Sequence, residues 1–225
     1  MASDGKDLLI QYDEVSKVGC VIKFIFDRVV ALLGLLGLSW LLGLIALLVK
    51  LKNPGQSVLF KQQRVGRHGK LFTMHKFRTM EGEQEESSVA YLEEKRITHF
   101  GARLRRFKLD ELPELWDVLA GKMSFVGPRP DVPGYADKLE GEDRLVLEMR
   151  PGITGLATLK YRDEETLIAN YVKQAKAKGD TRSEAEIALW YNDQVIYPDK
   201  VRLNLQYYRN YSFLLDLKIL LKTLF

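Results

Sequence analysis

Two acidic residues, Asp110 and Glu111, stand side by side in a basic stretch of the chain. They follow the basic segment RLRRFKL and precede the segment LPELWDVLAGKMSFVGPRP. Adjacent carboxylates in a cationic pocket suit a phosphorylated substrate together with a divalent metal. One carboxylate can attack phosphorus while the other holds Mg²⁺, which neutralises the charge of a diphosphate. Mg²⁺ commonly takes one or two protein carboxylates and leaves its remaining positions to phosphate and water.

Asp110 also has a purely structural interpretation. Proline is tolerated in the first turn of a helix, so a helix that starts between Glu111 and Pro113 places Asp110 at its N-terminal end. There Asp110 would cap the helix, and Glu111 would be a favourable first-turn charge. The positive end of the helix dipole would also keep Asp110 ionised, as a nucleophile requires.

Basic residues from several segments favour the catalytic interpretation. One group directly precedes the acidic pair, and the other residues come from three distant segments. These residues are Arg103, Arg105, Arg106, Lys108, Lys76, Arg78, Arg129 and Arg150. If their side chains converge, they form a cationic pocket around the two carboxylates. The sequence contains no Walker loop, dinucleotide fingerprint or nucleophile elbow that would suggest another chemistry.

The composition limits the class of protein. The 225 residues suffice for one domain of good size with a small additional element. Lys and Arg number 34 against 30 Asp and Glu. This mildly basic balance suits a membrane surface or an anionic substrate better than nucleic acid. The single cysteine, Cys20, rules out an internal disulfide and suits a reducing compartment, and three scattered histidines indicate no zinc site.

An uncharged run of 21 residues extends from Val29 to Val49. At about 1.5 Å per residue it would just cross a hydrocarbon core of about 30 Å. Basic residues flank both ends, which conflicts with a simple span because such flanks favour the cytoplasmic side. A segment that enters the membrane, bends near residues 37–40 and returns satisfies both flanks. We therefore predict a re-entrant helix, with a true span as the alternative.

The rest of the chain predicts a mixed domain. SVLFKQQR and KLFTMHKF flank the turn sequence VGRHG and predict a β-hairpin. Residues 81–95 are acidic and predict a solvated helix or loop. Helices are expected over 100–119 and over 163–192, the second interrupted at 178–180. The last helix, capped by Ser212, is almost wholly apolar and either joins the core or lies in the membrane interface.

These elements predict an α+β fold that is mostly helical. We expect a single compact domain with a small β-hairpin, an N-terminal membrane-embedded helix and interfacial amphipathic helices. The expected organisation has a tail over residues 1–19, the membrane-embedded helix over 20–52 and a cytoplasmic catalytic domain over 53–225. The sequence contains no internal repeat and no low-complexity linker.

Four motifs resemble one bacterial family. HKFRTM, LDELPELWDVLAGKMSFVGPRP, RPGITG and YSFLLDLKILLKT occur here in the order found in the bacterial sugar transferases. These are small monotopic phosphoglycosyl transferases that act on polyprenol phosphate, and the resemblance extends from about residue 20 to residue 225. It implies transfer of a phospho-sugar from a UDP-sugar to undecaprenol phosphate with release of UMP. This would be the first membrane step of bacterial glycoconjugate biosynthesis.

The resemblance also implies roles for single residues. Asp110 matches the nucleophile, which forms a covalent aspartyl phospho-sugar that the lipid phosphate then attacks in a ping-pong cycle. Glu111 matches the residue associated with Mg²⁺. Asp216 matches an acid with a positional or metal-proximal role, and a plain helix-surface charge is its alternative interpretation. The candidates for binding substrate phosphates are Lys76, Arg78, Arg105, Arg129 and Arg150.

The same resemblance implies a location and partners. It places the protein at the bacterial inner membrane, with the catalytic domain on the cytoplasmic face and in contact with membrane lipids. Nucleic acid is not an expected partner, and monomer and homodimer both stay open. In one departure, the family's membrane helix usually carries a kinking Ser-Pro pair, whereas Ser39-Trp40 stands here and no proline lies between Val29 and Val49. Re-entrance is therefore predicted from the basic flanks and from the need to gather the site on one face.

Two other functions stay open from the sequence. A membrane-bound nucleotide-sugar pyrophosphatase would use water as the final acceptor and would release UMP without lipid. A non-enzymatic membrane protein would bind anionic lipid head groups through its basic face and would tolerate Asp110→Asn. The adjacent acids argue against the second alternative, because they would weaken the binding of anionic lipids. The sequence does not identify the sugar.

Overall fold

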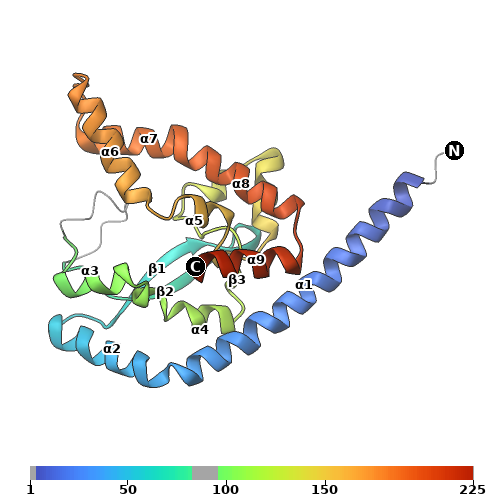
Figure 1. Ribbon diagram of the computed structural model, residues 1–225, viewed down its shortest axis with the longest axis horizontal. Helices are drawn as coiled ribbons and strands as arrows, with labels where there is room; N and C mark the ends of the chain where they lie inside the picture. Colours follow the sequence, from blue (N-terminus) through green and yellow to red (C-terminus); the bar gives the residue numbers. More distant parts are fainter. Residues whose placement is uncertain (1–3, 83–95, 225) are drawn as a thin grey trace.

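The computed structural model describes residues 4–82 and 96–224, so nearly all of the acidic segment predicted over 81–95 lies outside the described residues. The described chain folds into a mostly helical domain with two small sheets (Figure 1). A long N-terminal helix passes along one edge of the domain, and its first turns extend away from the other elements (Figure 1). The predicted combination of many helices with a small β-hairpin is confirmed.

Two helices form a bent pair at the start of the chain. α1 (Asp4–Gly37) and α2 (Ser39–Lys52) meet at Leu38, and the segments Val21–Gly37 and Ser39–Lys52 are inclined to each other by 64°. The Ser39 hydroxyl donates to the Leu36 carbonyl at 2.8 Å, a side-chain hydrogen bond of the kind that accompanies helix bends. The bend predicted near residues 37–40 is therefore confirmed, although no proline causes it.

The same pair is the only part of the described chain with the character of a membrane segment. Among the described residues, no single helix is both long enough and apolar enough to cross a membrane, while the two bent segments meet this criterion together. α1 begins at Asp4, so residues 4–19 continue the same helix.

The predicted β-hairpin is confirmed. β1 (Leu59–Val65) and β2 (Leu71–Phe77) pair antiparallel, with Leu59 opposite Phe77 and Val65 opposite Leu71. The turn between them is the short 3-10 helix η1 (Arg67–Gly69). Alternate residues of a strand point to the same side, so Lys76 shares a side of β2 with the buried Met74.

The predicted helices over 100–119 are present but interrupted. Thr98 caps α3 (His99–Arg106), because its hydroxyl oxygen accepts a hydrogen bond from the Gly101 N–H at 2.8 Å. A 3-10 turn, η3 (Leu109–Glu111), separates α3 from α4 (Glu114–Leu119). Lys108 precedes this turn with a φ of 55°, a left-handed conformation that interrupts the helical path after α3.

A parallel pair of short strands orders the second half of the chain. β3 (Ser124–Val126) pairs with β4 (Gly152–Thr154), which brings the GPRP and RPGITG segments together. The short helices between these strands are η4 (Ala136–Lys138) and η5 (Gly141–Glu148). The elements after β4 are α5 (Leu156–Lys160), α6 (Glu164–Ala177), α7 (Glu184–Tyr191), the π-helix η6 (Asn192–Ile196), α8 (Tyr197–Arg209) and α9 (Phe213–Leu224). The predicted interruption at 178–180 is confirmed, since it falls between α6 and α7.

Both arms of the bent pair pack against the same domain. Ala31 of α1 lies in an apolar cluster with Met74 and with residues of α4 and the following turn. Ile45 and Val49 of α2 lie in a second cluster with Phe77 of β2 and with residues of α3. The opposite faces of the two helices remain apolar and exposed, at Leu33, Leu36, Trp40, Leu47 and Leu51.

α9 is amphipathic, as its sequence predicts. The Ser212 hydroxyl oxygen accepts a hydrogen bond from the Leu215 N–H at 3.2 Å and so caps the helix. One face buries Asp216 and Ile219, whereas Leu221 on another face is exposed. The helix therefore contributes to the core and also presents an apolar surface.

Candidate active site

Asp110 lies in the 3-10 turn between α3 and α4 and is buried. α4 begins only at Glu114, and neither η3 nor α4 has a side-chain cap, so the capping interpretation of Asp110 is wrong. Its Oδ1 atom is buried and has no hydrogen-bond partner among the described residues. A buried carboxylate oxygen without a partner is costly in a folded protein, which points to a functional role for Asp110.

The expectation that Asp110 is held ionised by a helix end is also wrong. Burial raises the pKa of Asp110, and the charge of Glu111 raises it further. Lys76, Arg105 and Lys108 act in the opposite direction and only partly offset the burial. The side chain is therefore a poorly solvated carboxyl group whose ionised form is reactive.

Glu111 is held by two cations from distant parts of the chain. Its Oε1 atom accepts hydrogen bonds from Lys76 Nζ and from Arg129 Nη2, both at 2.8 Å. Although burial opposes ionisation, Arg129 and Lys76 hold the pKa of Glu111 well below its usual range. The adjacent carboxyl groups of Asp110 and Glu111 thus have opposite pKa shifts, which is typical of sites where two acids have different roles.

Glu114 is a third acid of this site that sequence reasoning missed. Its Oε1 atom lies 3.2 Å from Lys76 Nζ, and the residue is 2% exposed. Burial raises the pKa of Glu114, and the charge of Glu111 adds to this effect. The spacing of three residues from Glu111 in LDELPEL was the available signal, because such residues share a helix face.

Backbone contacts position Arg129. The Val65 N–H of β1 donates to the Asp131 carbonyl at 2.9 Å, and Arg64 Nη1 donates to the Pro130 carbonyl at 3.1 Å. Glycine is required where this segment meets the RPGITG segment, because a Cβ on Gly127 would lie 2.3 Å from a backbone oxygen. The hairpin that carries Lys76 therefore also holds the segment that carries Arg129.

Arg105 reaches the same site from α3. Its charge lowers the pKa of Asp110, and its Nη1 atom is buried without a hydrogen-bond partner among the described residues. Its Nη2 atom lies 2.9 Å from Glu165 Oε1 at the start of α6. Arg105 thus brings a positive charge near Asp110 and links α3 to α6.

The other predicted residues lie elsewhere. Arg78 Nε donates to the Ser57 carbonyl at 3.0 Å and so holds the loop before β1. Arg150 Nε donates to the Gly121 carbonyl at 3.1 Å, beyond the C-terminal end of α4. Asp216 accepts a hydrogen bond from Lys23 Nζ in the contact between α9 and α1. The structure therefore brings together Asp110, Glu111, Lys76, Arg105 and Arg129.

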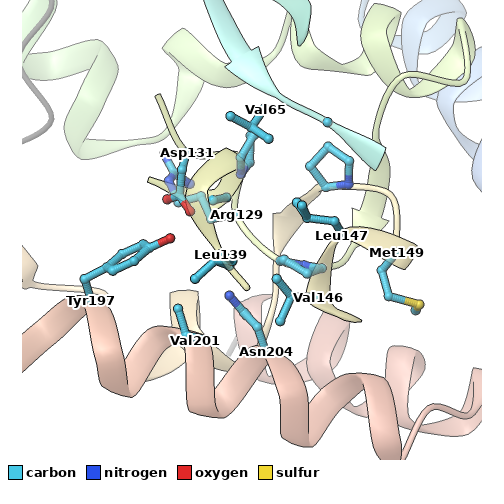
Figure 2. A pocket seen from close by; sticks show the side chains of 15 residues that line it. Val65, Arg129, Asp131, Leu139, Val146, Leu147, Met149, Tyr197, Val201 and Asn204 are labelled. Carbon is cyan, nitrogen blue, oxygen red and sulfur yellow. The ribbon is translucent and has the colours of Figure 1, made fainter. Parts of the chain in front are cut away.

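Arg129, which binds Glu111, also lines a small pocket (Figure 2). Its interior of about 20 Å³ has room for one water molecule. Tyr197 and Asn204 of α8 point into the pocket (Figure 2), and the Tyr197 hydroxyl is buried without a hydrogen-bond partner among the described residues. Burial raises the pKa of Asp131, which also lines the pocket, to about 6. Arg129 thus belongs both to the carboxylate site and to this mostly apolar pocket.

The carboxylate oxygens of this site are suitable ligands for a hard cation that also binds substrate oxygens. Asp110 offers a buried oxygen without a partner, and Glu111 is ionised beside it. In the part of the chain that the structure describes, no three or more His, Cys, Asp or Glu side chains surround a common metal position. Two carboxylates match the way Mg²⁺ binds in phosphate sites, where the substrate and water complete its shell.

Comparisons with known proteins identify the family of this chain. The family model of the bacterial sugar transferases matches residues 18–225. An uncharacterized sugar transferase of Bacillus subtilis (strain 168), EpsL, is 35% identical over 203 residues, which are 90% of this chain and 85% of that protein.

Two further relatives carry names that state a reaction. The UDP-glucose:undecaprenyl-phosphate glucose-1-phosphate transferase of Escherichia coli (strain K12) is 35% identical over 99% of this chain and 44% of its own length. The UDP-N-acetylgalactosamine-undecaprenyl-phosphate N-acetylgalactosaminephosphotransferase of Aeromonas hydrophila is 31% identical over 93% of this chain and 44% of its own length. The names specify different sugars, so these similarities do not select one.

Proposed function

Because the chain belongs to the bacterial sugar transferase family, we propose that it moves a phospho-sugar from a UDP-sugar to polyprenol phosphate and releases UMP. The reactions named for two relatives support this reaction and suggest undecaprenol phosphate as the acceptor. The observation that carries the proposal is the buried Asp110 carboxyl, whose unpartnered oxygen stands beside the cation-bound Glu111.

In the first half-reaction, the Asp110 carboxylate attacks the phosphorus that carries the sugar. A bond forms between an Asp110 oxygen and phosphorus, while the bond from phosphorus to the oxygen of UMP breaks and UMP leaves with the electron pair. The unpartnered Oδ1 suits this step, because no hydrogen bond has to be broken before the attack. The guanidinium group of Arg105 and the cations on Glu111 attract the diphosphate into place.

In the second half-reaction, an oxygen of the polyprenol phosphate attacks the same phosphorus. The bond between phosphorus and the Asp110 oxygen breaks, the carboxylate is restored, and polyprenol diphosphate sugar leaves. A covalent intermediate lets one cationic site handle two bulky phosphate substrates in turn. This two-step route accounts for a nucleophile that is buried and yet surrounded by phosphate-binding side chains.

We propose Mg²⁺ as the cofactor, held by Glu111 with Asp110 nearby. When bound, Mg²⁺ would neutralise negative charge on the donor diphosphate. Lys76 and Arg129 fix the position of the Glu111 carboxylate through hydrogen bonds to one of its oxygens. They also keep Glu111 ionised, as a metal ligand must be.

The packing of the bent pair supports a re-entrant membrane segment. Ala31 before the bend and Val49 after it both pack against the same domain, so the two ends of the uncharged run emerge on one side. The exposed apolar faces of α1 and α2 would be covered by lipid, as would the exposed face of α9. We propose that the domain lies on the cytoplasmic face of the bacterial inner membrane, where the lipid acceptor is confined.

The proposal is tested by UMP release from the purified full-length chain in detergent. The assay contains Mg²⁺, undecaprenol phosphate and a panel of UDP-sugars, and it is run with and without the lipid. Lipid-dependent release that Asp110→Asn abolishes is the expected result. Lipid-independent release would indicate the pyrophosphatase instead, and silence with every donor would contradict the proposed reaction.

A further inference from the structure

His75 of β2 and Asp117 of α4 are joined by two hydrogen bonds. The His75 backbone N–H donates to Asp117 Oδ2 at 2.9 Å, and the ring atom Nδ1 of His75 lies 2.9 Å from Asp117 Oδ1. A carboxylate only accepts hydrogen bonds, so Nδ1 is the donor in the second one. Asp117 is 0% exposed. Among the described residues, both oxygens of this fully buried carboxylate therefore find their partners on His75 alone.

The backbone contact holds α4 along β2 (Figure 1). In the described chain, the sheet of β1 and β2 has only these two strands, so one edge of β2 has no strand partner. The N–H groups of such an edge need other acceptors when they are shielded from water. Asp117 supplies one of these acceptors, and α4 is thereby fixed against the edge of the strand.

α4 depends on such contacts for its position. It has six residues and, among the described residues, no side-chain cap. A helix of this length is not stable without tertiary contacts. Val118 of α4 packs in an apolar cluster with Met74 of β2, but apolar contacts are not directional. The paired hydrogen bonds to Asp117 are directional, so they determine where along β2 the helix lies.

This docking also sets the position of the residues that hold Glu111. Lys76 directly follows His75 in β2. Glu114 lies three residues before Asp117, on the same face of α4. Lys76 Nζ lies 3.2 Å from Glu114 Oε1 and 2.8 Å from Glu111 Oε1. Two consecutive residues of the strand thus contact the helix three residues apart, and a shift of α4 along β2 would carry both glutamates away from Lys76.

We propose that the hydrogen-bonded pair of His75 and Asp117 positions Lys76 at the carboxylate site. This inference rests on the proposed function, in which Glu111 must be held in place beside the nucleophile. Neither member of the pair has to touch a substrate for this role. His75 acts through the placement of Lys76, and Asp117 acts through the placement of α4.

A double-mutant cycle on folding stability tests this alignment without any substrate. The full-length chain is unfolded with denaturant in detergent as the wild type, His75→Leu, Lys76→Met and the double variant. Lys76→Met raises the equilibrium constant of unfolding by some factor in each background. We expect this factor to be at least about fivefold larger in the wild type than in His75→Leu, because Lys76 is already misaligned in that variant.

Thr73→Val is the matched control for this cycle. It removes a side-chain hydrogen bond between Thr73 and Gln63 of β1, and Thr73 lies on the same face of β2 as His75. The bond that is lost does not involve α4. In the Thr73→Val background, the factor for Lys76→Met should differ from its wild-type value by less than about twofold.

Two results of the cycle would overturn the inference. One is an equal factor for Lys76→Met in the wild type and in His75→Leu, which would make the pair a structural contact independent of Lys76. The other is a coupling of the same size with Thr73→Val. If His75→Leu does not fold, His75→Leu/Asp117→Asn takes its place, because it leaves no unpaired charge buried at this position.

A kinetic measurement connects the pair to the reaction. At a temperature where every variant is folded, His75→Leu should lower the single-turnover rate of UMP formation about tenfold, as the loss of a group that orients active-site ligands commonly does. His75→Asn should stay within about threefold of the wild type, because its amide N–H can replace the Nδ1–H donor. Equal rates of His75→Leu and the wild type, or no recovery in His75→Asn, would overturn the positioning role. If no UDP-sugar supports UMP formation by the wild type, the proposed function fails, while the stability cycle still decides whether the pair aligns Lys76.

Discussion

The ammonium group of Lys23 lies 2.7 Å from a carboxylate oxygen of Asp216, and both side chains are buried. This ion pair joins α1 to α9 across 193 residues of sequence. The other oxygen of Asp216 accepts a hydrogen bond from the Tyr207 hydroxyl at 2.6 Å. Asp216 therefore has two buried partners that fix the N-terminal helix to the C-terminal part of the domain, which favours a positional role for this acid.

Breaking this ion pair should destabilise the protein strongly. Lys23→Met leaves Asp216 buried without its cation, which typically costs about 3–5 kcal/mol. The double variant Lys23→Met/Asp216→Leu should recover much of that loss, because no charge is left buried. Denaturant unfolding in detergent measures both effects. Wild-type stability of the single variant would contradict the pairing, and loss of UMP release by a well-folded double variant would indicate a catalytic role for Asp216.

Asp110→Asn should separate activity from stability. We expect UMP release to fall by at least about a thousandfold, because the amide cannot act as the nucleophile. The variant should be at least as stable as the wild type at pH 8. The native fold disfavours ionised Asp110, so the wild type loses stability as pH rises above the pKa of the unfolded chain, and the amide removes this loss.

Intact-mass spectrometry checks the covalent step directly. The wild type incubated with donor and without acceptor should gain the mass of a phospho-sugar, and Asp110→Asn should not. The absence of this adduct from an active preparation would exclude the aspartyl intermediate.

The stability prediction for Asp110→Asn has its own contradicting outcome. A clear loss of folding stability in this variant would show that the carboxylate has a structural partner.

Lys76 should be needed for stability as well as for activity. Its ammonium group contacts Glu111 and Glu114, so Lys76→Met leaves two partly or fully buried carboxylates with fewer partners. The expected loss is about 3 kcal/mol in denaturant unfolding. Adding Glu114→Gln removes one of these carboxylates and should restore part of the stability without restoring UMP release. Full recovery of activity in the double variant would contradict a role for Lys76 at the substrate.

The donor half-reaction should lose rate in acid at a higher pH than an ordinary aspartate would cause. Burial raises the pKa of Asp110 above the usual value of about 3.9, so the protonated and unreactive form accumulates earlier as pH falls. Glu111 does not contribute to this limb, because Arg129 and Lys76 lower its pKa against the effect of burial. Single-turnover UMP formation between pH 4 and 8 tests this, and an unchanged rate down to about pH 4 would contradict the raised pKa.

Both ends of the uncharged run should face the cytoplasm. A membrane-impermeant thiol reagent added to intact cells should label neither Cys20, before the run, nor a cysteine placed after it in Cys20→Ser/Ser57→Cys. Both should react once the cells are permeabilised. Labelling of exactly one of the two sites in intact cells would establish a true span.

Several elements of this fold could be predicted from the sequence, because their causes lie within a few residues. The β-hairpin follows from two strand-like segments around a glycine-containing turn, and the cap of α9 follows from Ser212. The bend near residues 37–40 was predicted from the basic flanks of the uncharged run, and it forms at Leu38 without proline. The acidic pair and the four motifs were likewise enough to predict the family.

The surroundings of Asp110 were decided only by the tertiary structure. The local sequence favoured a helix cap, whereas packing of α3 and α4 buries Asp110 in a separate turn and raises its pKa. The sequence also could not show that Arg150 donates a hydrogen bond to the turn after α4. Burial and contacts between distant segments depend on how whole elements pack, and local residue preferences do not encode them. The sequence by itself therefore determined the elements and the family, and the packing of those elements decided which charged groups share the site.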